Sequence, residues 1–124
     1  MEAFAATLEP EPSVLRGFRQ RLNDWLIAAE VSAAARDAVV LAAHEAVANA
    51  IQNVEPKGPV KVTGHVDDTA ILIEVTQAGR WGKAQQDEPD ERGRGIPLIK
   101  AYMTDVEFRR ERGHTTVRMR LIQP

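Results

Sequence analysis

The stretch HEAVANAIQN, residues 44–53, decides the fold of this chain. Glu45, Asn49 and Asn53 recur every four residues within an otherwise apolar run. On a helix each such step turns the side chain by only about 40° around the axis, so these polar groups share one edge. The other edge is apolar and is expected to pack on a core: Val39, Ala43, Ala46, Val47, Ala50 and Val54.

The polar edge carries a carboxylate and two carboxamides, which all offer oxygen atoms beside a buried seam. Such donors suit a hard cation such as Mg2+, and a carboxylate so placed can accept the proton of a hydroxyl group. A solvated helix edge would show the same spacing, and both interpretations stay open on this stretch alone. The pattern therefore predicts a helix and offers a candidate site.

Composition narrows the class of protein. The chain has 124 residues, 44% of them hydrophobic and 27% charged, which predicts one globular domain over residues 1–124. The absence of cysteine excludes a disulfide scaffold and a thiolate nucleophile, and it suits a reducing cytoplasm. No apolar run is long enough to cross a membrane, and a net charge of -2 with interspersed signs gives no indication of a nucleic-acid partner.

Apolar residues at helical spacing come first along the chain, and segments in which apolar and polar residues alternate, as in strands, come after them. Ser13 and Ser32 are expected to cap helices that run to about Ala29 and to the turn signal near Glu55, and 96–103 reads as a short helix. Alternation and turn signals predict strands at about 60–66, 71–75, 106–110 and 115–122, with a polar loop over 77–92. Helices and strands in separate blocks predict an α+β two-layer sandwich, in which helices cover a mixed, mainly antiparallel sheet.

A second motif, Arg92-Gly93-Arg94-Gly95, stands directly before the short helix. Two glycines let a backbone approach a ligand closely, and a helix start offers free N–H groups with partial positive charge. Together with Arg92 and Arg94, the glycines and the helix start form a candidate phosphate-binding site. Glycines before a helix also serve as simple loop punctuation, and the motif alone does not choose between these interpretations.

Two further runs complete a pattern: Val75-Thr76-Gln77-Ala78-Gly79 at a strand end and Gly113-His114-Thr115-Thr116-Val117 opening the last strand. In the order acidic helix, strand-end glycine, polar loop, glycine pair, helix and Gly-x-Thr-Thr strand, the chain resembles the GHKL (Bergerat-fold) ATPases. It is most similar to the small bacterial anti-sigma-factor serine kinases. The resemblance covers about residues 10–122 and rests on the order and spacing of four motifs.

The resemblance implies Mg-ATP as the cofactor and assigns roles to the polar helix edge. Glu45 matches the acid that acts as general base on the accepting serine or on its positioning network. Asn49 matches the Mg2+ ligand whose metal bridges the ATP phosphates, and Asn53 faces the nucleotide one turn further on. Phosphoryl transfer depends mainly on positioning, a metal and hydrogen-bond donors, which agrees with this set of residues.

The remaining implied roles lie at the strand ends, the loop and the first helix. The segment of about 80–92 would be the ATP lid, and Arg16 lies where the family carries an arginine that contacts protein partners. The nucleotide-binding positions implied besides Asn49 and Asn53 are Gln77, Gly79, Gly93, Arg94, Gly95 and Thr115.

The chain departs from the family pattern at three positions. Gln77 stands where the family has the aspartate that accepts a hydrogen bond from the adenine amino group, and Trp81 stands for the second glycine of that motif. Gln77 accepts only as a neutral carbonyl, which weakens the bond by about 1 kcal/mol. His114 replaces the glycine before the paired threonines, so its side chain is expected to crowd the adenine.

The resulting expectation is an anti-sigma-factor serine protein kinase. Such a protein binds Mg-ATP, sequesters a sigma factor, phosphorylates a serine on an anti-anti-sigma (STAS-type) partner, and works as a homodimer. One alternative is a partner-switching binding module of the same fold whose nucleotide site has decayed at Gln77, Trp81 and His114. A second alternative is the catalytic domain of a sensor histidine kinase.

Overall fold

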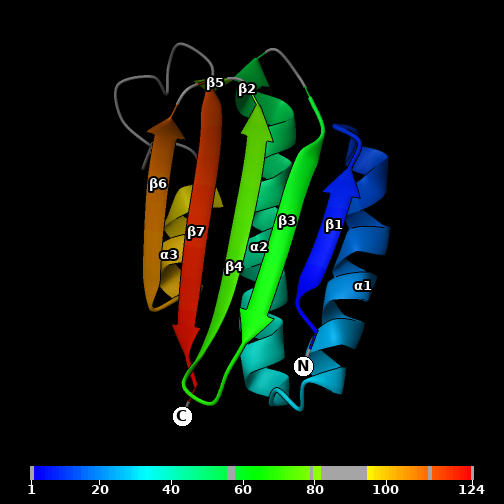
Figure 1. Ribbon diagram of the computed structural model, residues 1–124, viewed down its shortest axis with the longest axis vertical. Helices are drawn as coiled ribbons and strands as arrows, with labels where there is room; N and C mark the ends of the chain where they lie inside the picture. Colours follow the sequence, from blue (N-terminus) through cyan, green and yellow to red (C-terminus); the bar gives the residue numbers. More distant parts are fainter. Residues whose placement is uncertain (1, 56–57, 79, 82–94, 112, 124) are drawn as a thin grey trace.

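The computed structural model describes residues 2–55, 58–78, 80–81, 95–111 and 113–123, with the backbone alone at 53–55, 80–81 and 95–96. Figure 1 shows one layer of helices against one face of a sheet. In chain order the elements are β1 (Phe4–Leu8), the 3-10 turn η1 (Pro12–Val14), α1 (Leu15–Ala28), α2 (Ala33–Asn53), β2 (Val54–Glu55), β3 (Val60–Val66), β4 (Ala70–Ala78), β5 (Arg80–Trp81), α3 (Gly95–Tyr102), β6 (Asp105–Glu111) and β7 (His114–Ile122).

The described strands form a five-stranded sheet in the order β1-β3-β4-β7-β6, in which every neighbouring pair is antiparallel. A separate two-stranded pair joins β2 to β5. Alternate residues of β4 are buried under the helices, among them Ile71, Ile73 and Val75. This period of two lets one sheet face pack on the core while the other faces solvent. The expected α+β two-layer sandwich is confirmed.

The core lies between this sheet face and the apolar edges of α1 and α2. Phe18, Leu22 and Leu26 of α1 follow helical spacing and are buried. The apolar edge of α2 that the sequence predicts is buried at Val39, Ala43, Ala46, Val47 and Ala50. The polar edge of α2 is therefore held in a fixed direction by packing on its other side.

The first strand, β1, was not among the expected elements. Phe4, Ala6 and Leu8 point into the core, and β1 pairs with β3 at one edge of the sheet, where Phe4 lies opposite Gly64. The Phe4 ring packs against those of Phe18 and Trp25. A short alternating run gives a weak sequence signal, and this strand forms because α1 covers it.

Several expected boundaries need correction. Ser13 does not cap α1: it lies within η1, and neither η1 nor α1 has a side-chain cap, because Pro12 already sets the backbone at the first position. Ser32 does cap α2, since its Oγ accepts the Ala35 N–H at 3.3 Å. Val54 is not part of the apolar helix edge, because it lies in β2 and pairs with Trp81.

The segment predicted as a loop over 77–92 begins with strand residues instead. β4 continues to Ala78, and β5 follows within the predicted loop. Pairing with β2 and β7 satisfies backbone groups that a loop would leave to water.

The described charged residues of the last hairpin lie on the open sheet face except Arg110, which is the register partner of the buried Thr115. Arg109 forms an ion pair with Glu107 at 3.1 Å, and Arg120 forms one with Asp105. These pairs partly balance the positive charge of this solvated face.

Both ends of the chain lie at one end of the sheet, whereas the β2–β5 pair and the end of α2 lie at the other (Figure 1). Within the described residues, no helix is both long enough and apolar enough to cross a membrane.

Candidate functional site

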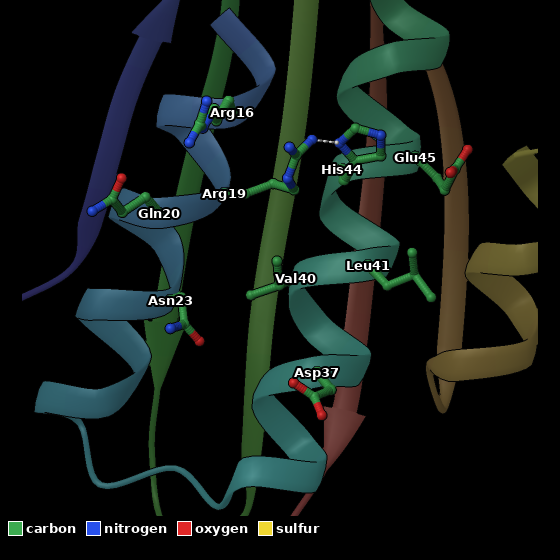
Figure 2. Close-up of a pocket in the computed structure, with 9 residues that line it drawn as sticks. All are labelled: Arg16, Arg19, Gln20, Asn23, Asp37, Val40, Leu41, His44 and Glu45. Carbon is green, nitrogen blue, oxygen red and sulfur yellow. Dashed lines mark hydrogen bonds between the residues drawn. The ribbon is translucent and has the colours of Figure 1, made fainter.

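The polar edge of α2 lies toward the β2–β5 end of the molecule. Glu45 is half-buried and points away from α1, on the side of α2 that faces α3 (Figure 2). Asn49, one turn further on, is 9% exposed. Asn53 is the last residue of α2, and its side chain lies outside the described part. The structure thus holds a carboxylate and a carboxamide on successive turns of a helix fixed by the core.

A second polar group sits at the end of β4 on the helix side of the sheet. Gln77 is 2% exposed, and its register partner on β7, Thr115, is 4% exposed. The Nε2 of Gln77 donates to the backbone carbonyl of Gly58 at 2.6 Å. Among the described residues its Oε1 has no hydrogen-bond partner, although it is buried.

This arrangement fixes what Gln77 offers to a ligand. Because Gly58 takes the amide nitrogen, the side chain presents its oxygen as an acceptor. A buried acceptor without a donor costs about 1–3 kcal/mol, so the site is suited to a ligand that brings an N–H group. The exocyclic amine of adenine is such a group.

His114 does not crowd this position. It is exposed and lines a hollow on the open sheet face with Glu74 and Arg109, whereas the next residue, Thr115, is buried on the helix side. The alternation of β7 separates the two residues. The expected obstruction at the adenine end is therefore wrong.

Other expected site residues fall partly or wholly outside the described residues. Gly79, Gly93, Arg94 and nearly all of the proposed lid (about 80–92) lie outside them, as does the Trp81 side chain. The short helix predicted after this motif is present as α3, which packs against α2, but it begins at Gly95 itself rather than after it.

Arg16 lies elsewhere, in a groove between α1 and α2 with a volume of about 690 Å³ (Figure 2). Arg19 and His44 line the same groove, and Glu45 lies at its rim. The Nδ1 of His44 is 3.0 Å from an Arg19 guanidinium nitrogen. No sequence pattern predicts this contact, because it joins two helices through residues that are 25 positions apart.

The donor set near Asn49 fits magnesium only in combination with a nucleotide. The described residues contain no group of three or more His, Asp or Glu side chains that could hold a metal by themselves. Mg2+ commonly takes one or two protein oxygens and completes its octahedron with phosphate and water oxygens. The Asn49 carbonyl and the adjacent Glu45 carboxylate are suited to that role.

Comparisons with known proteins agree with this geometry. Residues 8–121 match the histidine kinase-like ATPase domain, and the chain belongs to this family within the GHKL superfamily. Membership of this family implies that the domain binds ATP. No curated protein sequence matches the chain at a significant level.

The fold also recurs in a solved structure. A crystal structure of the RsbU and RsbW domains of Rv1364c from Mycobacterium tuberculosis superposes with a TM-score of 0.79 at 19% sequence identity. The match covers 100% of this chain and 34% of that chain, so the present chain spans about a third of that structure's length.

Proposed function

We propose that this domain is an ATP-dependent protein serine kinase of the anti-sigma-factor type. The observation that carries the proposal is that the Glu45–Asn49 edge of α2 and the buried Gln77 oxygen, which has no hydrogen-bond partner among the described residues, both lie on the helix side of the sheet. The first can serve the reacting phosphate, and the second can read the base.

In the proposed reaction the Asn49 carbonyl would hold Mg2+, and the metal would supply positive charge to the ATP phosphates. Glu45 accepts the proton of the acceptor serine as its hydroxyl oxygen bonds to the γ-phosphorus. The bond from that phosphorus to the β,γ-bridging oxygen breaks, and ADP is the leaving group. Gly93 and Arg94 would contact the phosphates from the lid side, and the start of α3 at Gly95 would add backbone N–H groups.

The Gln77 oxygen and Thr115 support an adenine site at the end of β4. Adenine presents an amine to an acceptor at this edge, whereas guanine presents a carbonyl oxygen that would oppose it. Gly79 and Asn53 complete this side of the nucleotide site in the proposal. A neutral acceptor predicts weaker base binding than a carboxylate would give, by about five- to tenfold.

The proposed partners are a sigma factor, which the domain sequesters, and a STAS-type anti-anti-sigma protein, which carries the accepting serine. Arg16 is exposed near the start of α1, on the outer side of the helix layer, where a partner can reach it. We propose that the domain works as a homodimer in the cytoplasm. These assignments rest on the motif resemblance.

Isothermal titration with ATP, with Mg2+ present or removed by EDTA, tests the proposal. Asn49→Ala is expected to abolish the magnesium-dependent part of ATP binding, because it removes the protein ligand of the metal. Gln20→Ala, an exposed position on α1, is the matched control and should bind as the unchanged protein does. Equal magnesium-dependent binding in Asn49→Ala would remove that residue from the site.

A partner-switching module without phosphoryl transfer is the second candidate, and the neutral acceptor at Gln77 favours it. In that case ATP would bind weakly, and the domain would act through its protein contacts. Incubation with radiolabelled ATP and a serine-bearing partner distinguishes the two candidates, because only the kinase transfers label to the partner.

A further inference from the structure

The chain that follows α2 is joined to the end of β4 at two places. β2 comes directly after α2 and pairs antiparallel with β5, and the two lie side by side at the end of α2 (Figure 1). Gly58 accepts the Nε2–H of Gln77 at 2.6 Å. We call β2 and Gly58 together the strap. The strap connects the helix that carries Asn49 with the strand that carries Gln77, so it touches both halves of the candidate site.

Both links involve positions at which this chain departs from the Asp-x-Gly-x-Gly pattern. Gln77 stands where that pattern has the aspartate, and a carboxylate has no N–H to donate to the Gly58 carbonyl. Trp81 stands where the pattern has its second glycine, and it is a strand residue paired with Val54. Glycine weakens a strand, so this exchange favours the pairing of β5 with β2. The strap is therefore fastened by residues particular to this chain.

The Gln77 amide is buried and is bonded on one side only. Its Nε2 is held by Gly58, whereas its Oε1 has no hydrogen-bond partner among the described residues. A donor that reaches Oε1 polarises the whole amide group and makes the Nε2–H a stronger donor to Gly58. Each bond also fixes the side-chain rotamer that the other bond needs, which lowers the entropy cost of forming it. The two bonds of this amide therefore stabilise each other.

We propose that the strap is a positioning element of the nucleotide site and that adenine closes it. The adenine amine donates to Oε1 of Gln77, the Nε2–H bonds more tightly to Gly58, and β2 is held against β5 at the end of α2. Because such coupling is reciprocal, a closed strap raises the affinity for adenine by the same factor. The proposal rests on the proposed function for the binding of ATP, and it adds a positioning role for β2, β5 and Gly58.

Amide hydrogen exchange of the intact chain without nucleotide tests the Gln77 link by itself. Hydrogen bonding alternates along an antiparallel ladder, so one of the two register pairs of β2 and β5 exchanges both of its N–H···O bonds. The amides at 54–55 and 80–81 therefore report the pairing. Gln77→Glu keeps the shape of the side chain but has no donor when it is ionised. At about pH 7.5 it should lower the protection factors of these amides about two- to tenfold, the effect of losing one buried hydrogen bond.

Acidification should restore the link in the same variant. The protonated carboxyl of Gln77→Glu can donate its O–H to Gly58, and burial raises the pKa of that carboxyl above the ordinary value of about 4.3. Its protection factors should return toward those of the unchanged protein as the pH falls to about 5. A defect of packing would not be rescued by a proton. Gln20→Glu is the same exchange at an exposed position of α1, and it should follow the unchanged protein at both pH values.

ATP and inosine triphosphate (ITP), each with Mg2+, test the role of the base in the unchanged protein. The two nucleotides carry the same phosphates, but ITP has a carbonyl oxygen where ATP has the adenine amine. Saturating ATP should raise protection at 54–55 and 80–81 about two- to tenfold more than at β1, which lies at the far edge of the sheet. ITP should produce no such difference between the strap and β1.

Three outcomes would overturn the proposal. Unchanged protection in Gln77→Glu at about pH 7.5 would show that the Gln77 bond does not hold the strap, and a loss that acid does not reverse would assign the effect to packing. Equal responses of the strap to ATP and ITP would show that the phosphates, and not adenine, close it. Absence of ATP binding in titration calorimetry would instead overturn the proposed function, whereas the exchange without nucleotide would still show whether Gln77 holds the strap.

Discussion

At the residue scale, the candidate site depends on atoms whose directions are set by their neighbours. Gln77 offers an oxygen because the Gly58 carbonyl holds its nitrogen. Glu45 points toward the α3 side because the opposite edge of α2 is packed into the core. In both cases the direction of a polar group that the sequence identifies depends on contacts that the sequence does not show.

Glu45→Gln should retain ATP binding and lose phosphoryl transfer by about 10²–10⁴-fold. The substitution keeps the shape of the side chain but removes the proton acceptor for the serine hydroxyl. Transfer of radiolabel from ATP to the partner gives the rate, and titration calorimetry gives the affinity. Transfer at the original rate would remove Glu45 from the role of base.

Gln77→Asp should have two opposing effects. From the sequence alone, a charged acceptor is expected to tighten ATP binding by about five- to tenfold relative to GTP. The structure adds a cost: aspartate cannot donate to Gly58, which should lower the free energy of unfolding by about 1–3 kcal/mol. Urea unfolding and parallel ATP and GTP titrations measure the two effects separately. Unchanged stability would contradict the Gly58 contact, and equal ATP and GTP curves would show that position 77 does not read the base.

At the element scale, α1 packs closely on the sheet at Gly64 of β3, next to the position of β1. A Cβ atom on Gly64 would lie 3.0 Å from Ile73 Cδ1 and 3.1 Å from two ring atoms of Trp25. The indole N–H of Trp25 in turn donates to the Glu2 carbonyl at 2.9 Å, just before β1. The close approach of helix and sheet therefore requires a residue without a side chain at position 64.

Gly64→Ala is expected to lower the free energy of unfolding by about 1–3 kcal/mol, because the added methyl group forces Ile73 or Trp25 to move. Gly17→Ala is the matched control, since a Cβ there meets nothing within 4 Å on α1. In a helix that exchange should raise stability by about 0.5–1 kcal/mol. Chemical unfolding monitored by Trp fluorescence gives both values, and a neutral Gly64→Ala would show that the contact is loose.

The elements differ in how far the sequence could predict them. α2, β3, β4 and the β6–β7 hairpin carry long periodic patterns and appear as expected. β1, β2 and β5 are short and exist because other segments pair with them, which is information that local pattern does not contain. The same holds for the site: Glu45, Asn49, Gln77 and Thr115 could be named, whereas the Gly58 carbonyl and the Arg19–His44 contact required the fold.

At the scale of the whole molecule, one histidine links stability to pH. The pKa of His44 is lowered in the folded state, first by burial and then by Arg19. The unfolded chain therefore binds a proton more readily than the folded one. The contribution of His44 to stability is complete above its ordinary pKa of 6.5 and is lost as the pH falls from there through the folded-state value.

Acidification from about pH 7.5 to about pH 5.5 should therefore lower the free energy of unfolding more in the unchanged protein than in His44→Gln. His65→Gln is the control, because His65 lies on the open sheet face, and it should behave as the unchanged protein does. Urea unfolding at the two pH values tests the difference. The same loss in His44→Gln would assign the acid sensitivity to other groups.

Both ends of the chain lie at the end of the sheet that is remote from the β2–β5 pair (Figure 1). A polypeptide joined to either end leaves the domain at the pole remote from Gln77 and from the end of α2. A domain anchored through either end would thus present the proposed nucleotide site outward, open to small molecules from solution. A fluorescent protein fused at either end should accordingly leave ATP affinity unaltered, and the two fusions should give matching titration curves.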